Sequence, residues 1–221
     1  MTVAGKSVTV YPSRAPGAPL VILNAGEEDD RDVLDAVGSL TRVDYSLACI
    51  GGLDWNGELS PWTAPAVYRG DVPFAGRADE YLRQLTEEII PAVERELGAP
   101  PAYRALAGYS LAGLFAVYSA YRTDAFSRIA SASGSFWFPG FCDFARDTRP
   151  ARCPDKLYLS LGDRESRTRN PVLSAVHENT ALILRRFEGL GVRSVFEENP
   201  GTHFQDAPLR MAKGIAWILA E

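Results

Sequence analysis

Short apolar runs rich in β-branched residues alternate along this chain with longer segments of helical periodicity, and this alternation restricts the possible folds most strongly. Strands that are separated by helices of ten or more residues lie mostly parallel, in a sheet that the helices cover on both faces. The sequence therefore predicts an α/β fold with a mostly parallel central sheet. The expected strands span residues 7–11, 20–24, 43–50, 103–108, 128–131, 156–161 and 193–197, and the expected helices span 30–40, 79–97, 111–121, 170–190 and 207–219.

The length of the chain indicates one domain. Its 221 residues match the usual size of a single α/β unit, and a chain of this size buries roughly 70% of its unfolded surface without a metal or a disulfide. We therefore expect one domain over residues 1–221 with no large lid domain. The cysteines, Cys49, Cys142 and Cys153, lack the C-x-x-C spacing of a zinc site. The sequence does not indicate whether Cys142 and Cys153 pair.

Charge and hydropathy argue against two classes of partner. The net charge of −5 and the pI of about 5.2 oppose a nucleic-acid partner, which requires a basic face. No apolar run approaches the roughly 18 residues of a membrane span, and the N-terminus lacks the apolar stretch of a signal peptide. We therefore expect a cytoplasmic protein with no membrane partner. The oligomeric state is left open.

The sequence changes from a strand pattern to a helical pattern at Gly108-Tyr109-Ser110-Leu111-Ala112. A G-x-S-x-G sequence at such a junction is typical of the nucleophile elbow, a strained turn that lifts a serine hydroxyl above the sheet. Larger side chains beside the serine would collide with the adjoining strand and helix. We therefore predict Ser110 as a nucleophile and the backbone N–H of Leu111, at a helix N-terminus, as an oxyanion donor.

The chain has two histidines, His177 and His203. His203 lies after the last expected strand and before the last expected helix, where a base would stand third in the chain order serine, acid, histidine. His177 lies inside an expected helix and has no such context. We therefore predict that His203 is the base that takes the Ser110 proton.

The acid should lie between the serine and the histidine in the chain. The expected strand 156–161 leads into Gly162, and Asp163 and Glu165 follow. One of these carboxylates would hold the imidazole in the correct tautomer and stabilise its protonated form. Glu165 is the preferred candidate and Asp163 is the alternative.

A long segment of irregular pattern, residues 51–76, follows the third expected strand. Loops of this length inside a compact domain are usually functional, and aromatic side chains commonly line ligand pockets. The segment therefore predicts the rim of a substrate pocket. The expected pocket residues are Trp55, Trp62 and Tyr68 from this segment, Tyr109 beside the nucleophile, and Trp137 and Phe138 after the fifth expected strand.

Four segments together resemble the Putative esterase family of the α/β-hydrolase superfamily. They are Gly108-Tyr-Ser-Leu-Ala-Gly-Leu, Ser131-Ala-Ser-Gly-Ser-Phe-Trp, Leu161-Gly-Asp-Arg-Glu and Gly201-Thr-His-Phe. The likeness runs from about residue 18 to the end and is greatest to small bacterial members. The family also includes esterase D, enterochelin-type siderophore esterases and feruloyl esterases. Ala112 departs from the family pattern, which has glycine there, but the change removes no chemical group.

The resemblance implies the α/β-hydrolase fold, no metal or other cofactor, and a serine carboxylester hydrolase. Such an enzyme acts on a small or medium ester or thioester through an acyl-enzyme. The family nucleophile, base and acid match Ser110, His203 and Glu165. A second oxyanion donor is implied at Gly52 or Leu53, after the third expected strand. Two alternatives stay open: an acyltransferase that uses the same triad, and a noncatalytic binding protein of this fold.

Overall fold

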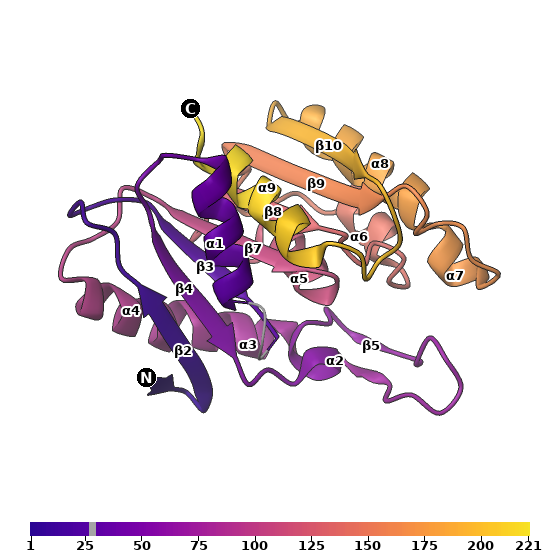
Figure 1. Cartoon of the computed structure of the whole chain (residues 1–221). Helices are drawn as coiled ribbons and strands as arrows, with labels where there is room; N and C mark the ends of the chain where they lie inside the picture. Colours follow the sequence, from indigo (N-terminus) through magenta and orange to yellow (C-terminus); the bar gives the residue numbers. More distant parts are fainter. Residues whose placement is uncertain (27–29) are drawn as a thin grey trace.

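The computed structural model describes residues 1–26 and 30–221, and an eight-stranded sheet forms its centre (Figure 1). The strands are β1 (Thr2–Val3), β2 (Lys6–Tyr11), β3 (Leu20–Asn24), β4 (Ser46–Gly51), β7 (Arg104–Tyr109), β8 (Arg128–Ala132), β9 (Lys156–Gly162) and β10 (Arg193–Asn199). Their order across the sheet is β1-β2-β4-β3-β7-β8-β9-β10. Neighbours from β4 to β10 pair in parallel, whereas β1 and β2 are antiparallel. The predicted mostly parallel sheet is confirmed.

Helices cover both faces of this sheet, as predicted (Figure 1). They are α1 (Asp30–Leu40), α3 (Ala78–Gln84), α4 (Ile90–Leu97), α5 (Leu111–Ser119), α6 (Phe141–Asp147), α8 (Val176–Glu188) and α9 (Ala207–Leu219). Successive strand residues point to opposite faces, so β3 contributes to two cores. Val21 and Leu23 pack with α1 and α9, whereas Leu20 and Ile22 pack with the apolar residues of α3, α4 and α5.

The boundaries of some elements differ from those that the sequence predicts. The expected helix 79–97 consists of α3, a π-helical segment η1 (Leu85–Ile89) and α4. The expected helix 170–190 is divided into α7 (Pro171–Ser174) and α8, and the Asn170 side chain caps α7 by accepting from the N–H of Val172. The segment 51–76 is not one irregular loop, because it contains α2 (Trp55–Glu58) and a small hairpin of β5 (Thr63–Ala64) and β6 (Phe74–Ala75).

A buried ion pair anchors α2 to the sheet. Lys6 Nζ on β2 lies 2.6 Å from both carboxylate oxygens of Glu58, and the two side chains are only 10% and 11% exposed. Glu58 also accepts from the backbone N–H of Asp54, whose own side chain caps the helix at Gly57. These contacts hold α2, and with it Trp55, beside the carboxyl end of β4.

Cys142 and Cys153 are both free thiols, so they do not pair, and Cys49 is buried in the core.

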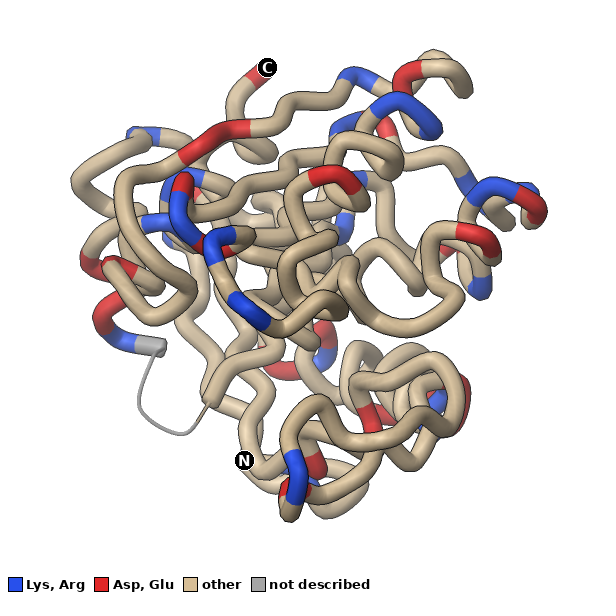
Figure 2. Tube along the Cα trace, turned by 90° about the vertical axis from the view of Figure 1, so that its right-hand side faces the viewer, with Lys and Arg blue, Asp and Glu red and all other residues tan. Residues whose placement is uncertain are grey.

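Acidic and basic positions are interspersed over the side of the molecule that Figure 2 shows. In the described part of the chain, every helix is too short or too polar to cross a membrane.

Candidate active site

Ser110 lies in the turn between β7 and α5, with φ of 58° and ψ of −122°. A positive φ is uncommon for a residue with a side chain, so this is the strained turn that the sequence pattern predicts. A Cβ atom on Gly108 would collide with the Ala112 backbone, and one on Gly113 would lie 2.7 Å from Ser131 Oγ. Strand and helix thus approach so closely that glycine is required at positions 108 and 113.

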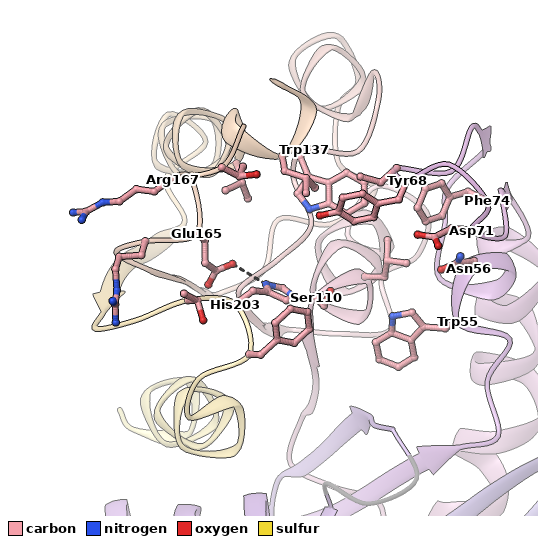
Figure 3. A pocket seen from close by; sticks show the side chains of 18 of the residues that line it. Trp55, Asn56, Tyr68, Asp71, Phe74, Ser110, Trp137, Glu165, Arg167 and His203 are labelled. Atoms are coloured by element: carbon pink, nitrogen blue, oxygen red, sulfur yellow. Dashed lines mark hydrogen bonds and ion pairs between the residues drawn. The ribbon is translucent and has the colours of Figure 1, made fainter. Parts of the chain in front are cut away.

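His203 connects Ser110 to Glu165 above the carboxyl end of the sheet (Figure 3). Its Nε2 atom lies 3.1 Å from Ser110 Oγ, and its Nδ1 atom lies 2.7 Å from Glu165 Oε2. An ionised carboxylate can only accept, so Nδ1 carries the proton and Nε2 is left to accept from the serine hydroxyl. The three residues follow β7, β10 and β9, which end at the same edge of the sheet.

Three donors hold the second oxygen of Glu165. This Oε1 atom accepts from the N–H of Gly162 at 2.6 Å, from Ser133 Oγ at 2.7 Å and from Arg210 Nη1 at 3.1 Å. Burial raises the pKa of this carboxyl, which is only 4% exposed. Hydrogen bonds, first from His203 and then from Gly162, outweigh burial, so the pKa lies below its ordinary value. Glu165 is therefore ionised at neutral pH.

The other predicted carboxylate, Asp163, has a different set of contacts. Its Oδ1 atom accepts from the N–H of Gly201 at 2.7 Å, which ties the loop of His203 to the end of β9. Of the two candidate acids, the structure therefore brings Glu165 to the imidazole. His177, the other histidine, lies on α8 with its ring 3.0 Å from Glu198 on the surface.

A cavity of about 440 Å³ opens over Ser110. Three of the predicted pocket residues line it: Trp55, Tyr68 and Trp137. Figure 3 shows these aromatic side chains across the cavity from Glu165. The cavity therefore has a polar side, which holds Ser110, His203 and Glu165, and an aromatic side supplied mainly by the segment after β4.

The remaining predicted pocket residues do not belong to the described lining of this cavity. Phe138 is buried, and Trp62 packs edge-on against it while its indole N–H donates to Pro139 O at 2.9 Å. These two rings therefore support the wall from behind. Tyr109 lines a separate cavity of about 240 Å³, and its hydroxyl donates to the backbone oxygen of His203 at 2.6 Å.

Several site residues were not predicted from the sequence. Phe74, from β6, and Phe204 also line the cavity. Phe204 is 91% exposed, and its ring centroid lies 5.1 Å from that of His203. The sequence could have indicated Phe204 as a site residue, because it directly follows the predicted base. The sequence could also have indicated Arg210, because it is a charged residue beside the apolar stripe of the last helix.

The predicted oxyanion donors differ in their position relative to the cavity. Leu111 begins α5 and lines the cavity, and the first N–H groups of a helix have no partner within it. Gly52 and Leu53 follow β4 and are not among the described lining residues. β3 lies between β4 and β7 in the sheet and Asn24 pairs with Gly108, so Ala25 and Gly26, directly after β3, adjoin the strand that leads to Ser110. The described lining therefore gives no support to a donor at Gly52 or Leu53, and chain order does not reveal that β3 adjoins β7.

The chemistry of the site follows from its donor set. Among residues 1–26 and 30–221, no group of three or more His, Cys, Asp or Glu side chains is arranged to hold a metal ion. The groups that meet at the cavity are a hydroxyl, an imidazole and an ionised carboxylate. This arrangement can remove a proton from the hydroxyl as the oxygen attacks an electrophilic carbon.

The model of a family described as "Putative esterase" matches residues 46–193 of the chain. Similar solved structures include the siderophore hydrolase EstA from Aspergillus nidulans, with a TM-score of 0.78 and 19% identity over 97% of this chain and 89% of that chain. An IroE-like serine hydrolase from Shewanella oneidensis has a TM-score of 0.80 and 16% identity, over 96% of this chain and 75% of that chain. The enterobactin esterase FES from Shigella flexneri has a TM-score of 0.71 and 18% identity, over 97% and 54% of the two chains.

A curated relative, the protein YbbA of Bacillus subtilis, described as uncharacterized, is 25% identical over 118 residues. The alignment covers 52% of this chain and 47% of that protein, so it spans about half the length of the relative. The solved structures named above are all less than 25% identical to the chain, and their likeness shows the α/β-hydrolase fold.

Proposed function

Because the chain belongs to the family described as "Putative esterase", we propose that it is a serine hydrolase that cleaves small or medium carboxylic esters or thioesters through an acyl-enzyme. The observation that carries this proposal is the continuous hydrogen-bonded chain from Ser110 Oγ through His203 to Glu165. Its support includes the strained backbone at Ser110, which is typical of a nucleophile elbow.

The reaction proceeds in two steps. His203 takes the proton from Ser110 as the serine oxygen attacks the ester carbonyl, and the imidazolium then protonates the departing alcohol or thiol. Water loses a proton to the same imidazole as its oxygen attacks the acyl-enzyme, and the imidazolium then returns that proton to Ser110 Oγ as the acid is released. The N–H of Leu111 stabilises the oxyanion in both steps. We place the second oxyanion donor at Ala25 or Gly26, directly after β3, which adjoins β7.

The charge of Glu165 has a defined part in both steps. It accepts from Nδ1 of His203 at 2.7 Å, which keeps Nε2 unprotonated before each attack. When the imidazole becomes charged, the carboxylate beside it stabilises the positive form.

A fluorophosphonate probe combined with p-nitrophenyl esters of increasing acyl length tests this proposal. We expect the wild type to be labelled and active, and Ser110→Ala to lose both the label and about a millionfold of turnover. His203→Ala should lose a comparable part of the activity, whereas His177→Ala, at a surface ion pair, should stay within twofold of the wild type.

Two outcomes would contradict the proposal. A folded wild type that neither takes up the probe nor hydrolyses any ester would favour a noncatalytic binding protein. Labelling that persists in Ser110→Ala would place the nucleophile elsewhere. Product analysis with a competing alcohol distinguishes transfer to water from transfer to the alcohol, because the same triad serves both acceptors.

A further inference from the structure

A buried guanidinium lies directly behind the proposed triad. Arg210, on the first turn of α9, is 1% exposed, and its Nη1 atom lies 3.1 Å from Glu165 Oε1. Its Nη2 atom donates to Pro200 O at 2.9 Å, and Nη1 makes longer contacts of 3.4 Å with Ser133 Oγ and Tyr109 Oη. Burying a cation costs free energy unless it is paired and hydrogen-bonded, so these contacts are what allow an arginine to lie here.

The end of β9 is shaped to admit this guanidinium. A Cβ atom on Gly162 would lie 2.9 Å from both terminal nitrogens of Arg210 and would collide with Gly201 O. The glycine that precedes the acid therefore leaves the space that Arg210 occupies. Gly162 also donates its N–H to Glu165 Oε1, so the same residue serves the acid and makes room for the cation.

Arg210 contacts Glu165, and it also contacts the loop that carries His203. Pro200 lies three residues before His203 in the chain and accepts from Nη2. Tyr109, which contacts Nη1, donates its own hydroxyl to the His203 backbone oxygen at 2.6 Å. Burial raises the pKa of Tyr109, so this hydroxyl keeps its proton at neutral pH. The guanidinium therefore joins the end of β9, the end of β7 and the loop after β10.

We propose that Arg210 is a positioning residue that fixes Glu165 and the His203 loop relative to each other and whose charge limits how strongly Glu165 favours the imidazolium form of His203. The proposal rests on the proposed hydrolase function. Arg210 reaches one carboxylate oxygen while His203 holds the other. The carboxylate can thus orient the imidazole through Oε2 while part of its charge is balanced at Oε1.

Other charged groups near this cluster have partners of their own. Asp163 accepts from Gly201 and lies 3.8 Å from Arg164, and Lys213, further along α9, lies 2.6 Å from Glu197. Within the described residues, Glu165 has an ion pair with Arg210 and a hydrogen bond with His203. Tyr109 contacts Arg210 from β7, Asp163 contacts the His203 loop at Gly201, and Arg164 and Arg167 line the same cavity as Glu165. Asp206 directly precedes α9, and Lys213 on α9 contacts Glu197 and Asn199 instead.

The test compares Arg210→Met, which removes the charge, with Arg210→Lys, which keeps it. Lys213→Met is the matched control, since it removes a cation from the same helix without touching the triad. The readouts are kcat/KM for a p-nitrophenyl ester across pH, the rate of fluorophosphonate labelling, and the NMR titration of the His203 ring. Circular dichroism checks that each variant is folded.

For Arg210→Met we expect kcat/KM to fall at least about tenfold, because Glu165 and the His203 loop lose their common anchor. We also expect the acid limb of the profile, and the midpoint of the His203 NMR titration, to move up by about 1 pH unit, as removal of a nearby cation dictates. Arg210→Lys should restore most of the pH shift but not the full rate. Lys213→Met should match the wild type in both the rate and the pH profile.

An unshifted acid limb and an unshifted His203 titration in a folded Arg210→Met would overturn the proposal, even if the rate fell. If Arg210→Met does not fold, Arg210→Gln provides the second measurement, because it removes the charge but keeps a polar side chain at this position. Arg210→Gln should move the acid limb up as Arg210→Met does, and an unshifted acid limb would then count against the proposal. A wild type without labelling or hydrolysis rejects the hydrolase function itself, which separates the two failures.

Discussion

Glu165→Gln should change the protonation of the base while leaving the shape of the site intact. Three donors surround the Oε1 position, so the amide oxygen of the glutamine occupies it. The amide NH2 group then faces His203 Nδ1, which lies 2.7 Å from the replaced oxygen. Nδ1 must accept, so the imidazole proton moves to Nε2 and points at Ser110. In this tautomer the histidine cannot take the serine proton.

The separation of the His203 and Glu165 charges sets the size of the expected loss of rate. With their charge centres about 4 Å apart, an imidazolium and a carboxylate attract by about 4 kcal/mol at the effective dielectric constant of a partly exposed site. Each 1.36 kcal/mol of lost transition-state stabilisation lowers a rate about tenfold, so loss of the charge alone lowers kcat by about 10³. The unfavourable tautomer brings the expected loss towards about 10⁴.

Asp163→Asn is the matched control in the same loop. The contact of Asp163 with the Gly201 N–H needs only an acceptor oxygen, which the asparagine amide keeps, so we expect kcat/KM within tenfold of the wild type. Steady-state hydrolysis of p-nitrophenyl acetate measures both variants. The reasoning fails if Glu165→Gln keeps kcat/KM within tenfold of the wild type, or if Asp163→Asn loses as much as Glu165→Gln does.

Two further predictions concern stability. The pKa of Glu165 is lowered in the folded state, so the unfolded chain binds its proton at higher pH; the stabilisation from this carboxylate is complete above about pH 4.3 and is lost as the pH falls further. Urea unfolding should therefore show the wild type losing its advantage over Glu165→Gln below that pH, and an advantage that grows there would refute the sign. Lys6→Met leaves Glu58 buried without its partner and should cost about 3–5 kcal/mol of unfolding free energy. The double variant Lys6→Met/Glu58→Leu should recover most of that loss, and a double variant as unstable as the single one would contradict the argument.

The parts of the fold that follow from local patterns could be predicted from the sequence. β3, α1 and α9 begin and end where the apolar pattern indicates. The apolar pattern of each of these segments depends only on which of its own residues are buried. The approach of His203 to Ser110 also agrees with the order of strands and helices along the chain. The parallel sheet brings the carboxyl ends of distant strands to one edge. The position of His203 after the last strand was therefore sufficient to predict that it approaches Ser110.

The features that were missed depend on contacts between distant segments. The prediction of a donor at Gly52 or Leu53 did not take into account that β3, rather than β4, lies next to β7. The contact of Arg210 with Glu165 joins α9 to the end of β9, and periodicity within α9 cannot reveal it. α2 has only four residues, which is too short for a helical period to appear. Its position depends instead on the Lys6 contact to Glu58.

The two sides of the Ser110 cavity come from different stretches of the chain. The proposed triad is held by the loops after β7, β9 and β10, whereas much of the aromatic wall comes from the segment from α2 to β6. If the proposed function holds, the residues that cleave the bond and many of those that would contact the substrate come from separate segments. A mutant library confined to residues 55–74 would vary ligand preference while the reacting atoms kept their places, which makes this scaffold a practical starting point for directed evolution.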